Sequence, residues 1–243
     1  MSLDDGRRLL PPRETHWIPL SDLMTGLMMV FLLVSIAYMV QAEAQKAAAE
    51  TAKQRVTDIA VLYKQLQTEL YQDLRSEFEK DLPRWGAELD QTTIRFREPD
   101  VLFDTGKDTL KPRFKSILDD FFPRYVRILT SDKYRESIEE VRIEGHTSSF
   151  WSSATSDQEA YFRNMELSQA RTRTTLSYVM SLDPVFDQLL WLRKHVTANG
   201  LSSARAIIGA NGKEDTLRSQ RVEFRVRTDA ESRIAKILES TTP

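Results

Sequence analysis

"WIPLSDLMTGLMMVFLLVSIAYMVQ", residues 17–41, is the most apolar stretch of this 243-residue chain. As a helix, residues 18–40 would be about 34 Å long at about 1.5 Å per residue, enough to cross the roughly 30 Å hydrocarbon core of a bilayer with slight tilt. Trp17 and Tyr38 lie near its ends, as interfacial anchors do. A cleaved signal peptide has a shorter apolar region followed by a small-residue cleavage site. The stretch therefore predicts an uncleaved transmembrane helix at 18–41.

Basic residues flank this helix on both sides and bear on its orientation. Three precede it and three follow it: Arg7, Arg8 and Arg13, then Lys46, Lys53 and Arg55. The first three lie closer to the membrane on average, and positive charge favours the cytoplasmic side. We therefore expect a single-pass protein of the bacterial inner membrane, with a cytoplasmic N-terminus at 1–17 and a periplasmic C-terminal domain.

Asp22 is the one charged side chain in the apolar stretch. A carboxylate is favoured by the dipole in the first turn of a helix, where headgroup water can also reach it. The alternative is functional, because an ionised Asp costs about 2.5–3.5 kcal/mol at the centre of a bilayer. Thr25 and Gly26 share its face at i+3 and i+4, and such residues favour packing against another helix. From these residues alone, both interpretations stay open.

The overall composition narrows the function classes. The 34 basic and 36 acidic residues nearly balance and give no argument for nucleic acid as a partner. Because the chain has no cysteine, disulfides and thiolate metal sites are excluded. The three histidines, His16, His146 and His195, are far apart, so we expect no histidine-rich metal site. We find no Ser-His-Asp arrangement, metal cluster or phosphate-binding glycine loop, and we do not expect an enzyme.

Residues 42–85 are predicted to form a helical periplasmic linker. The segment begins with strong helix formers and without Gly or Pro, and Pro83 marks its end, with the helix running to about residue 82. An apolar stripe recurs at spacings of three or four: Ile59, Leu62, Leu66, Leu70, Leu74 and Phe78. The stripe either packs on the chain's own domain or joins two copies; it is too short and irregular for a sustained heptad seam.

From about residue 92 the pattern alternates between strands and helices. Strands are predicted at TTIRF (92–96), EEVRIEG (139–145), ARAIIGAN (204–211) and QRVEFRVRTD (220–229). Helices are predicted at 112–129, 159–182 and 183–196, the first beginning with Pro112. This alternation predicts an α/β sandwich with a mixed sheet, followed by a C-terminal tail at 230–243.

The apolar stretch resembles a known family. SDLMTGLMMVFLLV (21–34) is similar to the transmembrane segment of MotB-type stator subunits, with matches at Asp22, Met24, Thr25, Met28 and Phe31. The resemblance implies an ion-driven stator with no bound cofactor. Asp22 of each copy in a homodimer would carry H⁺ or Na⁺, with Thr25 beside the ion path, and MotA-like subunits would surround that dimer.

Four further motifs resemble the OmpA-like peptidoglycan-binding domain over residues 90–229. They are VLFDTGKDTLKP (101–112), VRIEGHTSS (141–149), NMELSQAR (164–171) and SQRVEFRV (219–226). The resemblance implies that Asn164, Leu167 and Arg171 line a pocket for the diaminopimelate of peptidoglycan stems. Arginine can bind a carboxylate with two hydrogen bonds, and asparagine both donates and accepts. The alternatives are that Leu167 belongs to the core and that Arg171 is solvated.

The chain departs from that family at several positions. After the Gly-His-Thr motif the family has Asp, which helps bind an ammonium group, whereas this chain has the neutral Ser148. The family's Asn-Arg-Arg before the last strand is matched here only by Arg221. The loop at 149–160 is longer than the usual turn of the family. Its Phe150 and Trp151 either cover the pocket or form a hydrophobic plug within the loop itself. We expect His146 to be a hydrogen-bonded structural residue.

Over nearly its whole length, the chain is most similar to the MotB-like subunits of Zorya anti-phage defence systems. PLSDLMTGLMMVFLLVSIAYMVQ (19–41) and YFRNMELSQARTRTTLSYV (161–179) carry this resemblance. It implies five MotA-like (ZorA) subunits around two copies of this chain, with ion flow turning the outer ring. A flagellar-type stator and a passive peptidoglycan anchor are the alternatives.

Overall fold

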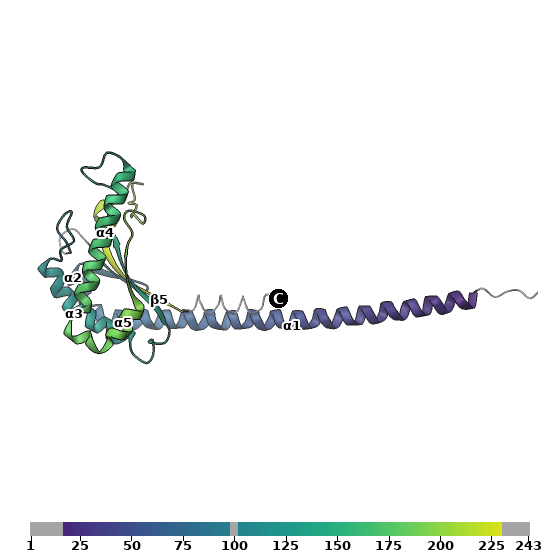
Figure 1. The fold of residues 1–243 in the computed structure, drawn as a ribbon. Coiled ribbons are helices and arrows are strands. Elements are labelled where there is room, and N and C mark those ends of the chain that lie inside the picture. The colour runs from purple at the N-terminus through teal and green to yellow at the C-terminus, as the bar shows by residue number, and fades with distance from the viewer. Residues whose placement is uncertain (1–16, 98–101, 230–243) are drawn as a thin grey trace, which may run out of the picture. The chain divides into compact units, whose positions relative to one another are not determined.

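The computed structural model describes residues 17–97 and 102–229 (Figure 1). It comprises two compact units, which divide between Arg55 and Val56, inside one long helix. Residues 1–16 of the segment predicted to be cytoplasmic (1–17) and the C-terminal tail lie outside the described residues. The structure confirms the predicted architecture of an apolar N-terminal helix followed by an α/β domain.

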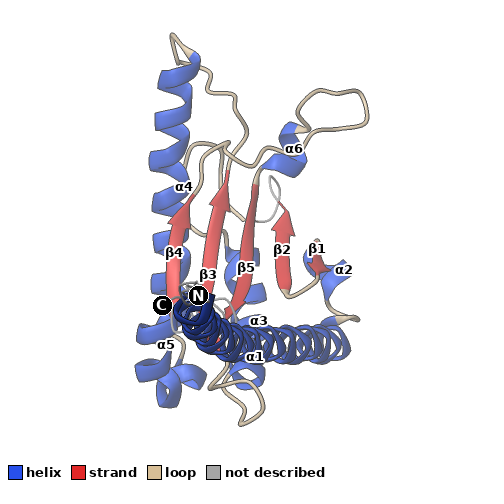
Figure 2. Ribbon diagram, turned by 90° about the vertical axis from the view of Figure 1, so that its right-hand side faces the viewer, coloured by secondary structure: helices blue, strands red, loops and turns tan. Residues whose placement is uncertain are grey.

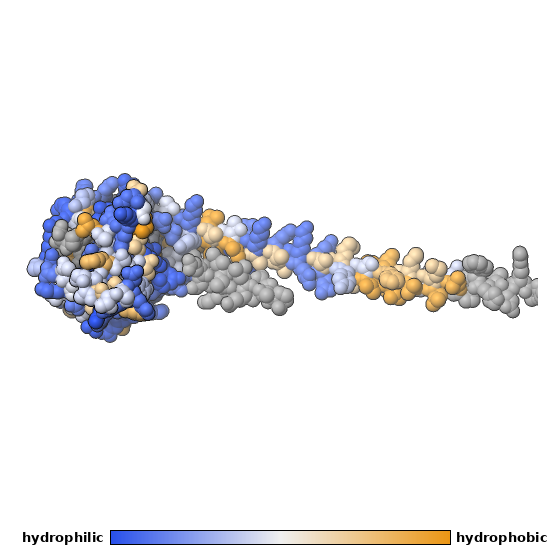
Figure 3. Space-filling view, turned by 90° about the horizontal axis from the view of Figure 1, so that it is seen from above, coloured by the Kyte–Doolittle hydropathy of each residue, from blue (hydrophilic) through white to orange (hydrophobic). Residues whose placement is uncertain are grey.

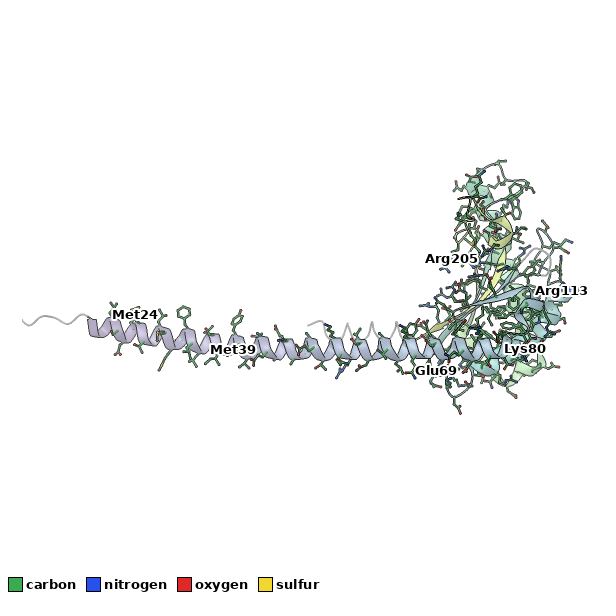
Figure 4. The ribbon with its side chains drawn as sticks, turned by 180° about the vertical axis from the view of Figure 1, so that it is seen from behind. Met24, Met39, Glu69, Lys80, Arg113 and Arg205 are labelled. Atoms are coloured by element: carbon green, nitrogen blue, oxygen red, sulfur yellow. The ribbon has the colours of Figure 1, made fainter. Side chains whose placement is uncertain are left out.

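The first unit contains the apolar part of helix α1, which runs from Trp17 to Phe78. Its most apolar window has a mean hydropathy of 2.3 and no buried residue. Figure 3 shows this segment as a continuous apolar surface, and the side chains of Met24 and Met39 stand out from it in Figure 4. A helix that is apolar all round needs an apolar environment, and this one is long enough to cross a bilayer.

The second unit includes the C-terminal part of α1. Leu70, Leu74 and Phe78 are fully buried in the core of the α/β domain, whereas Leu62 is 59% exposed. The predicted stripe therefore packs on the chain's own domain along its second half. Because these side chains belong to the core, the compact unit begins well before residue 90, at which the domain was predicted to start.

The end of α1 differs from the prediction. The helix ends at Phe78 rather than near residue 82, and a separate short helix, α2, covers Leu82–Trp85. Pro83 lies in the first turn of α2, where its missing N–H removes no helical hydrogen bond. Gly86 closes α2 with φ +63°, a left-handed conformation that glycine adopts without strain.

Five strands form one mixed sheet in the order β1-β2-β5-β3-β4 (Figure 2). The strands are β1 (Ala87–Asp90), β2 (Thr93–Arg97), β3 (Ile138–His146), β4 (Val196–Gly200) and β5 (Arg221–Thr228). All neighbours are antiparallel except β3 and β4, which are parallel. The helices are α3 (Pro112–Leu129), α4 (Asp157–Met180), the 3-10 helix η1 (Asp183–Gln188), α5 (Leu189–His195) and α6 (Thr216–Ser219).

The two faces of the sheet differ in chemistry because strand residues alternate between them. On one face, Phe224 of β5 packs against Phe121 and Tyr125 of α3, with ring centroids 5.1 and 6.1 Å away. Helix α4 covers the same face at β3 and β4. The other face carries charged residues of β2, β3 and β5.

Helix α4 approaches β4 so closely that Gly200 has no room for a side chain. A Cβ there would lie 2.3 Å from the backbone nitrogen of Gln169 and 2.8 Å from the Ser168 hydroxyl. Ser168 is itself fully buried and accepts a hydrogen bond from the Ser202 amide at 3.1 Å. The NMELSQAR motif thus fixes α4 against the sheet as well as contributing to a candidate site.

We expect Gly200→Ala to lower the free energy of unfolding by about 1–3 kcal/mol, because the helix backbone must shift to admit the methyl group. Thermal unfolding of the detergent-solubilised full chain would measure the change. Asn199→Ala, on the opposite face of the same strand, is the matched control. Equal stability of the two variants would contradict the close packing.

Three predictions about strands and helices need correction. Strand β1 was not predicted; it is a short edge strand that joins β2 through a turn in which Gln91 has φ +51°. The predicted strand at 204–211 is wrong: this segment forms turns and one isolated bridge, and the strand is β4, just before it. The predicted helix at 183–196 is broken into η1 and α5, and Val196 already belongs to β4.

Candidate functional site

All four predicted peptidoglycan-binding residues line one cavity of about 240 Å³: Ser148, Asn164, Leu167 and Arg171. Asn164, Leu167 and Arg171 lie on α4 at helical spacing, so they share a face. Ser148 comes from the loop that follows β3. Phe150 and Trp151 also line the cavity, which agrees with the interpretation that this loop covers it.

Arg171 is 5% exposed and is not the solvated helix residue considered above. Its Nε donates to the Lys107 carbonyl at 2.8 Å, and its Nη2 donates to the Asp104 carbonyl at 3.1 Å. The guanidinium also lies 4.9 Å from the centre of the Phe103 ring. Arg171 thus holds the 104–107 loop and lines the cavity at once.

Asn164 and Leu167 have distinct positions in the wall of the cavity. Asn164 is 3% exposed and donates through Nδ2 to the Phe150 carbonyl at 3.3 Å. Its amide oxygen can still accept a hydrogen bond from a ligand. Leu167 is half-buried and lines the cavity, whereas the sequence left open that it belonged to the core.

Glu214 fixes the loop that carries Ser148, a role that the sequence did not predict. Its carboxylate accepts hydrogen bonds from the Ser149 backbone N–H, at 3.1 and 3.2 Å, and from the Ser149 hydroxyl. On the other side, the Thr147 amide donates to the Ser202 carbonyl at 3.0 Å. Glu214 is distant in sequence and carries no motif, so no spacing pattern could have linked it to this loop.

A buried ion-pair network lies on the charged face of the sheet, beside the loop that bears Ser148. Cross-strand pairing places Glu144 next to Glu223, and Glu223 next to Arg95. Glu223 accepts hydrogen bonds from Arg95, Arg221 and Arg225 at 2.7–2.9 Å. Burial would raise the pKa of the Glu223 carboxyl, but these arginine hydrogen bonds outweigh it and lower the pKa to about 2.

His146 lies beside the two glutamates and is 2% exposed. Its Nε2 is 3.7 Å from a Glu144 oxygen, and neither ring nitrogen has a hydrogen-bond partner among the described residues. The prediction of a hydrogen-bonded histidine is therefore not met. Burial lowers the pKa of His146, which favours the neutral ring.

The three side chains Glu144, His146 and Glu223 are of types that can ligate a metal ion, and their ligand atoms lie within 4.8 Å of one another. Both carboxylates, however, already accept hydrogen bonds from arginines, including Arg225. A cation would therefore enter a site surrounded by guanidinium groups and would have to displace them.

Asp22 and Thr25 lie one helical turn apart on α1, and both are exposed in the isolated chain. The Thr25 hydroxyl donates to the Ser21 carbonyl at 2.8 Å, a bond within the helix. Thr25 also lines a shallow groove of about 300 Å³ together with Ser21, Met24, Leu27, Met28 and Phe31. Asp22 does not line this groove.

The chain has relatives among known proteins, although no family model matches it. It is 48% identical over 226 residues to the Zorya protein ZorB of Escherichia coli, covering 92% of each chain. Among solved structures, a MotB-like protein from Desulfovibrio vulgaris matches with 26% identity and a TM-score of 0.45, covering 68% of this chain and 95% of that one. The cell wall anchor of the T6SS from Pseudomonas aeruginosa matches with 19% identity and a TM-score of 0.44, covering 64% and 96%. Identity of this level over nearly the full length of both chains shows that the chain belongs to the ZorB family of Zorya proteins.

Proposed function

We propose that this chain is the wall-anchored, ion-carrying subunit of a membrane stator in anti-phage defence. The observation that carries the proposal is the cavity that gathers Ser148, Asn164, Leu167 and Arg171. Membership of the ZorB family supports the role in defence. The apolar helix supports insertion in a membrane. The basic residues that precede it favour a cytoplasmic N-terminus, with the α/β domain in the periplasm.

The cavity would hold a peptidoglycan stem through its diaminopimelate. Arg171 would bind the free carboxylate by charge-assisted hydrogen bonds, because the backbone bonds to the 104–107 loop already hold its guanidinium in place. Asn164 would accept a hydrogen bond from the peptide, and Leu167 would contact its apolar part. Ser148 would offer a hydroxyl dipole where an acidic residue would offer a charge.

In this proposal Asp22 is the ion carrier. Two copies of the chain would stand inside a ring of five MotA-like (ZorA-type) subunits, whose surfaces would shelter Asp22 from lipid. A carboxylate can bind and release H⁺ or Na⁺, so no further cofactor is required. The function is mechanical rather than enzymatic: wall anchoring holds this chain still while ion flow turns the ring.

Binding of the detergent-solubilised full chain to purified peptidoglycan sacculi tests the anchoring. We expect co-sedimentation of the unaltered chain and a roughly tenfold or greater loss of affinity in Arg171→Lys, because lysine cannot form the two-pronged contact. Leu167→Ala, which removes no hydrogen bond, should also weaken binding.

Arg193→Lys, the same exchange at an exposed position on α5, is the matched control. Thermal unfolding measured in parallel separates loss of binding from loss of the 104–107 loop. Unchanged binding in both Arg171→Lys and Leu167→Ala would contradict the assignment of this cavity as the peptidoglycan-binding site.

A further inference from the structure

The face of α4 that lines the first cavity continues along a second one. The residues follow at spacings of three and four: Asn164, Leu167 and Arg171 at the first cavity, then Thr174, Tyr178 and Ser181 at the second. Such spacing places them on one face of the helix. The second cavity is a groove of about 610 Å³, and Tyr178 lies about 10 Å along the helix axis from Arg171.

A single loop separates the two cavities. Thr105 and Gly106 line the first, whereas Asp108 and Thr109 line the second. Arg171 holds this loop through the carbonyls of Asp104 and Lys107. The two cavities are therefore neighbouring compartments of one surface, joined by the same helix and divided by one crossing of the chain.

The second groove is rich in hydroxyl groups, from Thr109, Thr174, Ser177 and Ser181. The Tyr178 hydroxyl donates to Asp119 at 2.7 Å, and Lys115 lies 5.5 Å from the centre of the Tyr178 ring. Two cations, Lys115 and Arg173, are offset by Asp108 and Asp119. Many hydrogen-bonding groups with little net charge suit a polyhydroxylated ligand better than an apolar one or a polyanion.

We propose that this second groove is a saccharide subsite, which takes the sugar strand of peptidoglycan while the first cavity holds the peptide branching from it. The inference rests on the proposed anchoring to the wall. Because peptide and sugar are covalently linked, binding of one raises the effective concentration of the other at the adjacent groove. A weak sugar site would then add to the total affinity without binding sugar strongly by itself.

Isothermal titration of the full chain with two probes tests the proposal. The probes are the stem tripeptide containing diaminopimelate and the same tripeptide attached to its N-acetylglucosamine–N-acetylmuramic acid disaccharide. We expect the disaccharide-peptide to bind about tenfold more tightly than the peptide. Arg173→Ala and the groove-filling Ser177→Trp, both at exposed positions, should remove most of this gain and leave affinity for the peptide unchanged.

Arg193→Ala, at an exposed position on α5, removes a positive charge away from the groove and should retain the full gain. The saccharide subsite would be overturned if the disaccharide added no affinity, or if the variants weakened binding of both probes equally. Binding of the tripeptide to the unaltered chain would still support the first cavity. If neither probe binds the unaltered chain, wall anchoring itself fails, and the subsite fails with it.

Discussion

Cells carrying the complete defence system with Asp22→Asn in this chain are expected to lose phage protection entirely, to the level of cells without the system. Asparagine has nearly the same shape as aspartate but cannot bind and release a proton or supply a negative charge for Na⁺. Because a neutral amide costs less in a bilayer than an ionised carboxylate, the variant should still insert. Plaque counts, with the amount of this chain in membranes measured in parallel, give the result.

Asp22→Glu is the control that keeps the carboxylate and should retain part of the protection. Full protection in Asp22→Asn would contradict ion carriage and would favour a passive anchor. A passive anchor predicts that Asp22→Asn is harmless and that only Arg171→Lys loses protection, whereas a stator loses protection in both variants. The pair of variants therefore distinguishes an ion-driven stator from a passive anchor.

Glu223→Gln is expected to lower the free energy of unfolding by about 3–5 kcal/mol, which is typical when one partner of a buried charge network is removed. Glu223 is 0% exposed and accepts hydrogen bonds from Arg95, Arg221 and Arg225. An amide leaves the buried Arg221 without the carboxylate that it pairs with, and leaves the more exposed Arg95 and Arg225 with one counter-charge fewer. Thermal or urea unfolding of the full chain measures the loss.

Glu88→Gln provides a matched comparison, because Glu88 also accepts a hydrogen bond from Arg95, at 2.9 Å, but its side chain is 31% exposed. We expect a change below about 1 kcal/mol there, since water can solvate the arginine that is left. Similar losses in the two variants would mean that burial does not set the strength of the network.

The Glu223 carboxyl also makes the stability of the fold depend on pH. Its pKa falls from 4.5 to about 2 on folding, so its contribution, about 3 kcal/mol, is fully present above pH 4.5 and is lost as the pH falls toward 2. Unfolding experiments between pH 5 and about 2.5 should show a weaker acid dependence in Glu223→Gln than in the unaltered chain. If the stability of the two proteins fell equally with pH, the lowered pKa of Glu223 would be contradicted.

Local chemistry explains which elements could be predicted from sequence. The helix at 112–129 begins at Pro112 and carries a strong apolar face, and the structure matches these bounds as α3. The long helices and the strand containing Phe224 were recognisable for the same reason: their periodicity is repeated over many residues. The edge strand β1 has only four residues, too few for alternation to stand out.

The strand wrongly predicted at 204–211 shows where local pattern fails. Ile207 and Ile208 suggest a strand, but Gly209 and Gly212 turn the chain there, and Gly212 has φ +73°. The neighbouring VTANG segment looks weak by itself and becomes a strand because β3 pairs with it. Pairing with β3 thus decides which of the two segments becomes a strand, and this pairing cannot be inferred from the local sequence.

The α4 residues of the candidate site could be predicted from the sequence, whereas the groups that hold them in place could not. Spacing alone places Asn164, Leu167 and Arg171 on one helix face, and the cavity gathers them as expected. The contacts that orient them come from distant backbone groups, such as the Lys107 carbonyl that holds Arg171. Long-range contacts of this kind depend on the whole topology, so neither they nor Glu214 could be inferred from a motif.

The side chain of Gln169 bears on whether copies of this protein can pair along the edge of the sheet. Its amide nitrogen donates to the Ala198 carbonyl at 3.2 Å, and its amide oxygen accepts from the Gly200 N–H at 2.7 Å. One side chain thus occupies two main-chain groups at the rim of β4, which a strand from another molecule would otherwise use. This edge of the sheet is thereby less open to pairing between molecules, which is a route to aggregation.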